Sequence, residues 1–228
     1  MFERYRFSTP YAEDLDLGIR LIRGGEKAAF LYRTRVLHSH NRPAYYFLKR
    51  GYVDARFTAA LIPETAFPVI HNPEHAFVDI AGLWARLHPV LSALEKRELP
   101  LALPVLMDQV KQGLMDGTHQ PVQNGRQIDS QLDGFIRELG PYDATIYRPA
   151  ENMVLPHVLQ HLDQLQGFLS QASTQLDEDV VSQIRTALPK IFALHAGSHL
   201  AYLYLEQGRK TAKNAEIDAI DKELTAGV

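Results

Sequence analysis

The chain has 228 residues, enough for one large domain or two small ones. It is 46% hydrophobic and 22% charged, which is typical of a globular protein with a buried core. These values exclude a disordered chain, a collagen-like repeat and a coiled-coil rod. The chain contains no cysteine, so disulfides and thiolate metal sites are excluded and a reducing compartment is expected.

The charge is distributed unevenly along the chain. The formal net charge of −3 gives no overall attraction to nucleic acid. Residues 1–60, however, contain 11 Lys or Arg against 6 Asp or Glu, whereas residues 61–228 contain 13 against 21. This asymmetry predicts two segments with different roles.

The hydrophobic pattern predicts a soluble protein. The N-terminus has no apolar region or cleavage site typical of a signal peptide. Apolar stretches are much shorter than the ~20 residues of a membrane helix and contain prolines. We therefore expect a cytoplasmic protein that at most attaches to the inner face of a membrane.

The basic segment alternates between predicted helix and predicted strand. Apolar side chains at helical spacing predict a helix over residues 11–23, which Gly24 and Gly25 end. Alternation with period 2 predicts a strand over 27–38. Pro43 then opens a second helix, which runs to about Leu61.

Almost everything after residue 62 is predicted as helix. Three prolines between residues 63 and 73 mark a boundary, so we expect one unit over 1–62 and a helical unit over 63–228. The helices are expected over 76–99, 101–115, 128–139, 152–173 and 177–207. Pro189 should bend or break the last of them, and the polar residues from about 208 should form a frayed helical tail.

A pair of acids and a histidine carry the most informative pattern. Glu13 and Asp14 begin the first predicted helix, and His38 ends the strand that follows it. One helix–strand unit could bring them to one rim, where a carboxylate can act as a base and a histidine can bind a divalent metal. The alternative remains open, because the helix dipole favours acids at this position without any function.

The order and spacing of these residues resemble the C-terminal end of the catalytic domain of family 2 glycosyltransferases. These are inverting enzymes with a GT-A fold, and the similarity is greatest to rhamnosyltransferase-like members. The resemblance covers about residues 8–60, a quarter of the chain. The matching residues, in order, are Tyr11, Glu13, Asp14, Asp16, Leu17, Arg20, Gly24, Val36, His38, His40, Tyr45, Tyr46, Lys49 and Arg50.

The resemblance implies roles for individual residues. Asp14, with Glu13 beside it, would deprotonate the acceptor hydroxyl. His38 and His40 would complete the coordination of a Mg²⁺ or Mn²⁺ ion at the leaving diphosphate. Asp16 and Arg20 would hold the helix that carries the acids. The substrate-side residues would be Arg20, with Lys49 or Arg50 at phosphate and Tyr45 and Tyr46 against an acceptor sugar.

The chain departs from the family pattern in one respect. In the family a nucleotide-binding half with an Asp-x-Asp motif comes first, and the dozen residues before Glu13 leave no room for it. We therefore expect a mainly α protein, in which a short α/β remnant of a GT-A catalytic domain precedes a helical bundle. Alone it should bind a nucleotide sugar poorly, and a partner chain could supply the donor-binding half.

Two functional hypotheses follow from this reading. The first is the C-terminal part of a metal-dependent transferase that moves a sugar from a nucleotide-diphospho donor to a glycan or lipid-linked acceptor. The second is a non-catalytic helical interaction protein that retains the glycosyltransferase remnant. Neither hypothesis implies nucleic acid as a partner.

Three pairs of histidines have the i, i+4 spacing that places two imidazoles on one face of a helix. They are His71/His75, His157/His161 and His195/His199. Pro73 interrupts the first pair, and the other two have no third ligand in the same motif. Metal binding and partly buried, hydrogen-bonded histidines are the alternative interpretations.

Overall fold

The computed structural model describes residues 5–6, 13–27, 41–62, 67–70, 72–95, 102–116, 128–140, 148–172, 176–208 and 214–227, to which every structural statement below refers. Its helices are α1 (Glu13–Arg23), α2 (Ala44–Leu61), α3 (Pro73–Glu95), α4 (Leu103–Met115), α5 (Ser130–Glu138), the 3₁₀ turn η1 (Pro149–Glu151), α6 (Leu155–Ala172), α7 (Glu178–Gly208) and α8 (Ala215–Thr225).

The prediction of a mainly α protein is confirmed. None of the described residues forms a β-strand, so the predicted α/β remnant finds no support in this part of the chain. The strand predicted over 27–38 lies outside the described residues apart from Lys27.

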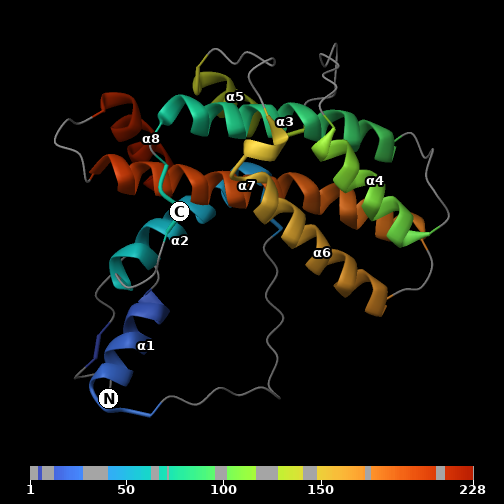
Figure 1. Cartoon of the computed structure of the whole chain (residues 1–228). Helices are drawn as coiled ribbons and strands as arrows, with labels where there is room; N and C mark the ends of the chain where they lie inside the picture. The colour runs from blue at the N-terminus through green and yellow to red at the C-terminus, as the bar shows by residue number, and fades with distance from the viewer. Residues whose placement is uncertain are drawn as a thin grey trace.

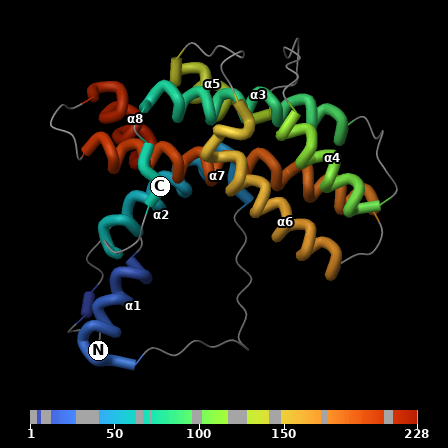
Figure 2. The backbone as a smooth tube through the Cα atoms, viewed as in Figure 1, coloured from blue at the N-terminus to red at the C-terminus, as the bar shows by residue number. Residues whose placement is uncertain are grey.

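Helix α7 is the centre of the fold. It contacts α2, α3, α6 and α8, while α4 packs on α3 and α6, and α5 packs on α2 and α3 (Figure 1). Buried side chains of α2 to α8 form one continuous hydrophobic core. Helix α2 shares this core although it lies before residue 62. Helix α1, in contrast, lies beyond the outer end of α2, away from the helical body (Figure 2).

The end of α1 is determined by its glycines, as the sequence predicts. Gly25 has a φ of 80°, a left-handed conformation that glycine adopts without steric cost. The Gly25 nitrogen donates to the Ile22 carbonyl over 3.0 Å, and the Glu26 nitrogen donates to the Leu21 carbonyl over 3.0 Å. These two bonds are those of a Schellman motif, which satisfies the last carbonyl groups of the helix.

Short polar side chains begin several helices. Asp129 Oδ1 accepts from the backbone nitrogens of Gln131 and Leu132 at the start of α5, both over 3.1 Å. At the start of α6, Asn152 Oδ1 accepts from the nitrogens of Val154 and Leu155, both over 2.8 Å. Each bond satisfies a donor that the helix itself leaves unpaired, so local sequence sets these starting points.

Helices α2 and α7 cross at very short distance because a glycine of each faces the backbone of the other. A Cβ atom placed on Gly51 would overlap the Leu194 carbonyl, and one placed on Gly197 would overlap the Leu48 carbonyl. Ser198 Oγ donates to the Gly51 carbonyl over 3.2 Å at the same crossing. Small residues at this point therefore let the two backbones touch.

Helix α7 continues through Pro189, so the break, one of the two effects expected of this proline, does not occur. Proline has no N–H to donate to the carbonyl four residues earlier, which here belongs to Arg185. Pro189 is itself buried. Packing of α7 on several neighbouring helices maintains the helix across this position.

The C-terminal tail is helical, as predicted, but its helix α8 packs on the body instead of fraying. Ile217 and Leu224 are buried against the core, at 3% and 0% exposure. Asp221 Oδ1 accepts from the Tyr52 hydroxyl over 2.7 Å and forms an ion pair with Arg56. The polar composition of this segment concealed its two buried side chains, and these dock α8 on α2.

Replacing Asp221 with alanine is expected to lower the free energy of unfolding by about 1–2 kcal/mol, because the buried Tyr52 hydroxyl loses its acceptor. Asp218→Ala is the matched control, since Asp218 is an exposed carboxylate of the same helix, and its effect should stay within about 0.5 kcal/mol. Urea unfolding of both variants measures the difference. Equal destabilisation by the two substitutions would contradict the role given to Asp221.

None of the described helices is both long enough and apolar enough to cross a lipid bilayer.

Candidate functional site

The two acids that the sequence identifies lie on the first turn of α1, and both are exposed. Asp14 Oδ1 accepts from the backbone nitrogen of Leu15 over 2.8 Å. His38 and His40, the predicted metal ligands, lie outside the described residues.

Asp16 and Arg20 form an ion pair on the same helix. Arg20 Nη2 lies 2.7 Å from Asp16 Oδ2, and Arg20 Nε donates to the same oxygen over 2.9 Å. The Arg20 guanidinium also donates to the Arg6 carbonyl over 2.6 Å. Arg20 thus connects the acid-bearing helix to the chain segment that precedes it. Asp14, by contrast, stays exposed and outside this ion pair.

Two of the predicted substrate-side residues of α2 contact α8 instead of an open surface. The Tyr45 hydroxyl donates to Glu223 Oε1 over 2.6 Å, and Lys49 Nζ donates to the Ala226 carbonyl. Burial and the hydrogen bond to Glu223 raise the pKa of Tyr45 above its ordinary value. These contacts are part of the docking of α8.

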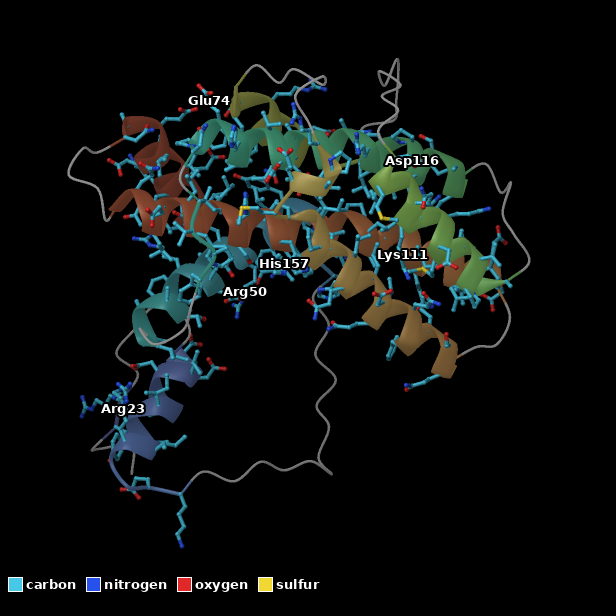
Figure 3. All side chains as sticks on the ribbon, in the orientation of Figure 1. Arg23, Arg50, Glu74, Lys111, Asp116 and His157 are labelled. Atoms are coloured by element: carbon cyan, nitrogen blue, oxygen red, sulfur yellow. The ribbon has the colours of Figure 1, made fainter. Side chains whose placement is uncertain are left out.

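The other two predicted residues of α2 remain at the surface. Arg50 is exposed (Figure 3) and pairs with Asp54, Nε to Oδ2, over 2.9 Å. Tyr46 is half-buried, with the Arg42 guanidinium 5.7 Å from its ring centre and the ring of Phe47 at 5.8 Å. The four residues of α2 therefore do not share one environment.

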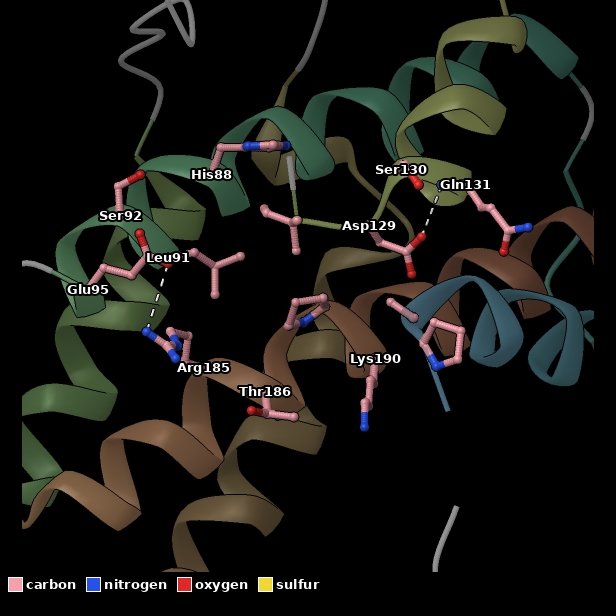
Figure 4. Close-up of a pocket in the computed structure, with 14 residues that line it drawn as sticks. His88, Leu91, Ser92, Glu95, Asp129, Ser130, Gln131, Arg185, Thr186 and Lys190 are labelled. Carbon is pink, nitrogen blue, oxygen red and sulfur yellow. Dashed lines mark hydrogen bonds and ion pairs between the residues drawn. The ribbon is translucent and has the colours of Figure 1, made fainter. Parts of the chain in front are cut away.

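A pocket of about 830 Å³ lies between α3, α7 and the segment that begins α5 (Figure 4). Its polar lining combines hydroxyl, amide and charged side chains: Ser92, Glu95, Ser130, Gln131, Arg185, Thr186 and Lys190. Arg185 and Glu95 form a loose ion pair of 3.8 Å across it. The pocket belongs to the helical body, whereas Asp14 belongs to α1.

Three helices bring metal-ligating side chains together at a second place, and each supplies an i, i+4 pair. Helix α3 supplies His75 and Asp79, α6 supplies His157 and His161, and α7 supplies His195 and His199. We call these six residues the histidine belt. Because α7 packs on both α3 and α6, the three pairs face a common region.

Direct contacts connect the members of the belt. His161 Nδ1 and His195 Nε2 lie 3.2 Å apart, and the rings of His157 and His195 stack with centroids 5.8 Å apart. His199 Nε2 lies 3.8 Å from Asp79 Oδ2, which is too long for a hydrogen bond. Asp79 Oδ2 instead accepts from the Met153 nitrogen over 3.0 Å.

His199 is the most buried member of the belt, at 4% exposure. Its Nε2 atom is buried without a hydrogen-bond partner. Leaving a buried polar atom unpaired costs about 1–3 kcal/mol. The sequence left two interpretations of these histidines, metal binding and hydrogen bonding in a partly buried place. Hydrogen bonding describes His195, which contacts His161, but it does not describe Nε2 of His199.

Burial determines the protonation states of the belt. It lowers the pKa of His195 to about 4, with further lowering from His161 and His157. It also lowers the pKa of His199 to about 4, with an added contribution from His157. For Asp79, burial raises the pKa to about 6, opposed by the Met153 nitrogen and by His75. At neutral pH, therefore, the buried imidazoles are uncharged and hold lone pairs available to a ligand.

The sequence contains the signal for this belt only in part. The pairs of α6 and α7 have the right spacing, but nothing in the sequence places them beside each other. Asp79 was not predicted as a site residue. It lies four positions after His75, as His75 lies four positions after His71, and only the histidine pair was considered. A search for His and Asp at i, i+4 would have found it.

The comparisons with known proteins gave no relative. No protein-family model, curated protein or solved structure matches this chain. Within the described residues, moreover, no three histidine, aspartate or glutamate side chains converge closely enough to hold a metal ion as they stand.

Proposed function

We propose that the chain is the C-terminal part of an inverting, family 2-type glycosyltransferase. The observation that carries the proposal is the ordered pattern from Tyr11 to Arg50, with Glu13 and Asp14 exposed at the start of α1. Arg20 supports it further, because this side chain pairs with Asp16 within α1 and donates to the Arg6 carbonyl, which holds the acid-bearing helix to the preceding segment.

In the proposed reaction Asp14 accepts the proton of an acceptor hydroxyl. The oxygen attacks the anomeric carbon from the side opposite the leaving group. The new C–O bond forms with inversion while the bond to the diphosphate oxygen breaks, and the nucleoside diphosphate leaves. Asp14 is exposed at the start of α1, where an acceptor hydroxyl could reach it.

The proposal assigns Mg²⁺ or Mn²⁺ to His38 and His40, with remaining ligands from a donor-binding half. That ion would neutralise charge on the diphosphate. The donor-binding half would come from a partner chain or another part of the same protein. Leu15 and Ile22, exposed apolar residues of α1 at 39% and 63%, offer contact area for it. The reaction would take place in the cytoplasm or at the inner face of the membrane.

Genetic complementation with Asp14→Asn tests the proposal in the organism that carries the gene. Loss of a general base typically costs about 10²–10⁴ in rate, so the variant should fail to restore the glycan that a deletion removes. Asp179→Asn is the control, because Asp179 is also an exposed carboxylate in the first turn of a helix but lies on α7. Sugar analysis of purified glycan and lipid-linked fractions measures the outcome.

Full complementation by Asp14→Asn would overturn the catalytic role. It would favour the second hypothesis, a non-catalytic helical interaction protein. In that case complementation of the deletion should depend on the apolar face of α1. Ile22→Asp should then abolish complementation more effectively than Asp14→Asn.

A further inference from the structure

The histidine belt carries an inference that is independent of the proposed transferase. We propose that it binds one divalent transition-metal ion of the Zn²⁺ type, with His157, His195, His199 and Asp79 as the ligands. Imidazole nitrogens with a carboxylate oxygen form the ligand set that such ions prefer.

The orphaned nitrogen of His199 is the first reason. Nε2 of a 4%-exposed side chain has no hydrogen-bond partner, and the nearest carboxylate oxygen, Asp79 Oδ2, is 3.8 Å away. Two atoms bound to one ion at about 2.0–2.2 Å lie roughly 3–4 Å apart. Asp79 Oδ2 already accepts from the Met153 nitrogen, and a cation beside it would give His199 Nε2 its missing partner at the separation that the structure already has.

The contacts across α6 and α7 are the second reason. His161 Nδ1 and His195 Nε2 lie 3.2 Å apart, and His157 stacks on His195. Without an ion, His161 Nδ1 and His195 Nε2 share a hydrogen bond whose donor depends on the tautomers of the two rings. With an ion on the other ring nitrogen of His195, His161 becomes the outer neighbour that orients the imidazole of His195. The i, i+4 spacing of His195 and His199 lets both reach one ion from the same helix.

One movement is required, because no three ligating side chains of the described residues yet converge. His157 is exposed at the start of α6 and is the member that can turn (Figure 3). A change of its χ1 rotamer, with the broad minima of the terminal torsion, lets its ring leave the stack and face the buried end of the belt. Binding should thus rely on His157 without requiring the core to rearrange.

The test uses the full chain without a histidine tag, stripped of metal with a chelator at pH 7.5. Isothermal titration with ZnSO₄ should give one ion per chain, and the melting temperature should rise by several degrees at saturation. Mg²⁺ at the same concentration should give no shift, because it binds poorly to imidazole. His157→Ala should weaken Zn²⁺ binding at least about tenfold without loss of folding, since its side chain is exposed.

His88→Ala is the control for a histidine outside the belt. His88 lies in the pocket near Asp133, at 3.7 Å from its carboxylate, and its removal should leave the Zn²⁺ affinity unchanged. X-ray absorption at the zinc edge adds a readout that does not depend on folding, and it should report nitrogen-rich coordination with histidine scattering. Absence of Zn²⁺ binding, or equal affinity in the wild type and His157→Ala, would overturn the proposal.

Discussion

Replacing Gly197 with alanine is expected to lower the free energy of unfolding by about 3–5 kcal/mol. The added Cβ would overlap the Leu48 carbonyl and lie 2.8 Å from the Tyr52 nitrogen. Both are backbone atoms of α2, so no side chain can rotate away. The helices must separate, and the buried small and apolar side chains along the crossing lose their contacts.

The matched control is Gly167→Ala in α6. Gly167 also lies within a helix, but it is exposed and a Cβ there would meet no atom within 4 Å. Alanine is a better helix former than glycine by about 1 kcal/mol, so this variant should be slightly more stable than the wild type. The expected changes in the free energy of unfolding have opposite signs in the two variants. This difference distinguishes the effect of steric overlap from that of helix propensity.

Chemical unfolding of the two variants measures both changes. Gly51→Ala offers a second version of the same test, because its Cβ would overlap the Leu194 carbonyl. If Gly197→Ala and Gly51→Ala each changed the free energy of unfolding by less than about 1 kcal/mol, the result would contradict the close crossing of α2 and α7.

Lowering the pH from 7 to 5 is expected to reduce the free energy of unfolding by about 2 kcal/mol. His195 and His199 have a pKa near 4 in the folded protein, against about 6.5 for an exposed histidine. The unfolded chain therefore binds more protons at these two residues between pH 6.5 and 4. Their stabilising contribution is complete above pH 6.5 and is lost as the pH falls toward 4.

Asp79 acts in the opposite direction. Its pKa is raised to about 6 in the folded protein, so the folded state binds more protons than the unfolded state between about pH 4 and pH 6. Its contribution to stability thus grows as the pH falls and offsets part of the loss caused by the histidines. Two histidines outweigh one carboxylate, so the net change keeps the sign of the histidines.

His195→Gln measures the histidine contribution directly. The glutamine amide does not titrate, so the variant should lose more than half of the stability change between pH 7 and pH 5. Urea unfolding at a series of pH values, in chelator to exclude metal ions, provides the measurement. A wild-type protein whose stability is flat over this range would show that the imidazoles of the belt do not titrate as their burial implies.

Local sequence predicted most of the helices, because their signals lie within a few residues. Gly25 ended α1 where the glycine pair indicated, and Pro43 stands directly before α2. The exceptions have tertiary causes. Pro189 did not break α7, because contacts on several sides maintain that helix. Helix α8 is packed and not frayed, because Ile217 and Leu224 are buried and the helix contacts α2.

The candidate sites divide in the same way. Glu13 and Asp14 can be found from sequence, because adjacent acids at a helix start form a local pattern. The roles expected for Tyr45 and Lys49 could not be judged locally, since their partners Glu223 and Ala226 lie nearly 180 residues later.

By itself the sequence determined that this is a mainly helical protein without disulfides, with a basic first segment that resembles part of a glycosyltransferase. Periodicity, caps and composition are local properties, so they need no knowledge of the fold. Only the tertiary structure decided that Gly51 and Gly197 each face the backbone of the opposite helix and that two histidine pairs and the His75–Asp79 pair form one belt. Both depend on which faces of α2, α3, α6 and α7 come together, and that is set by packing of the whole core.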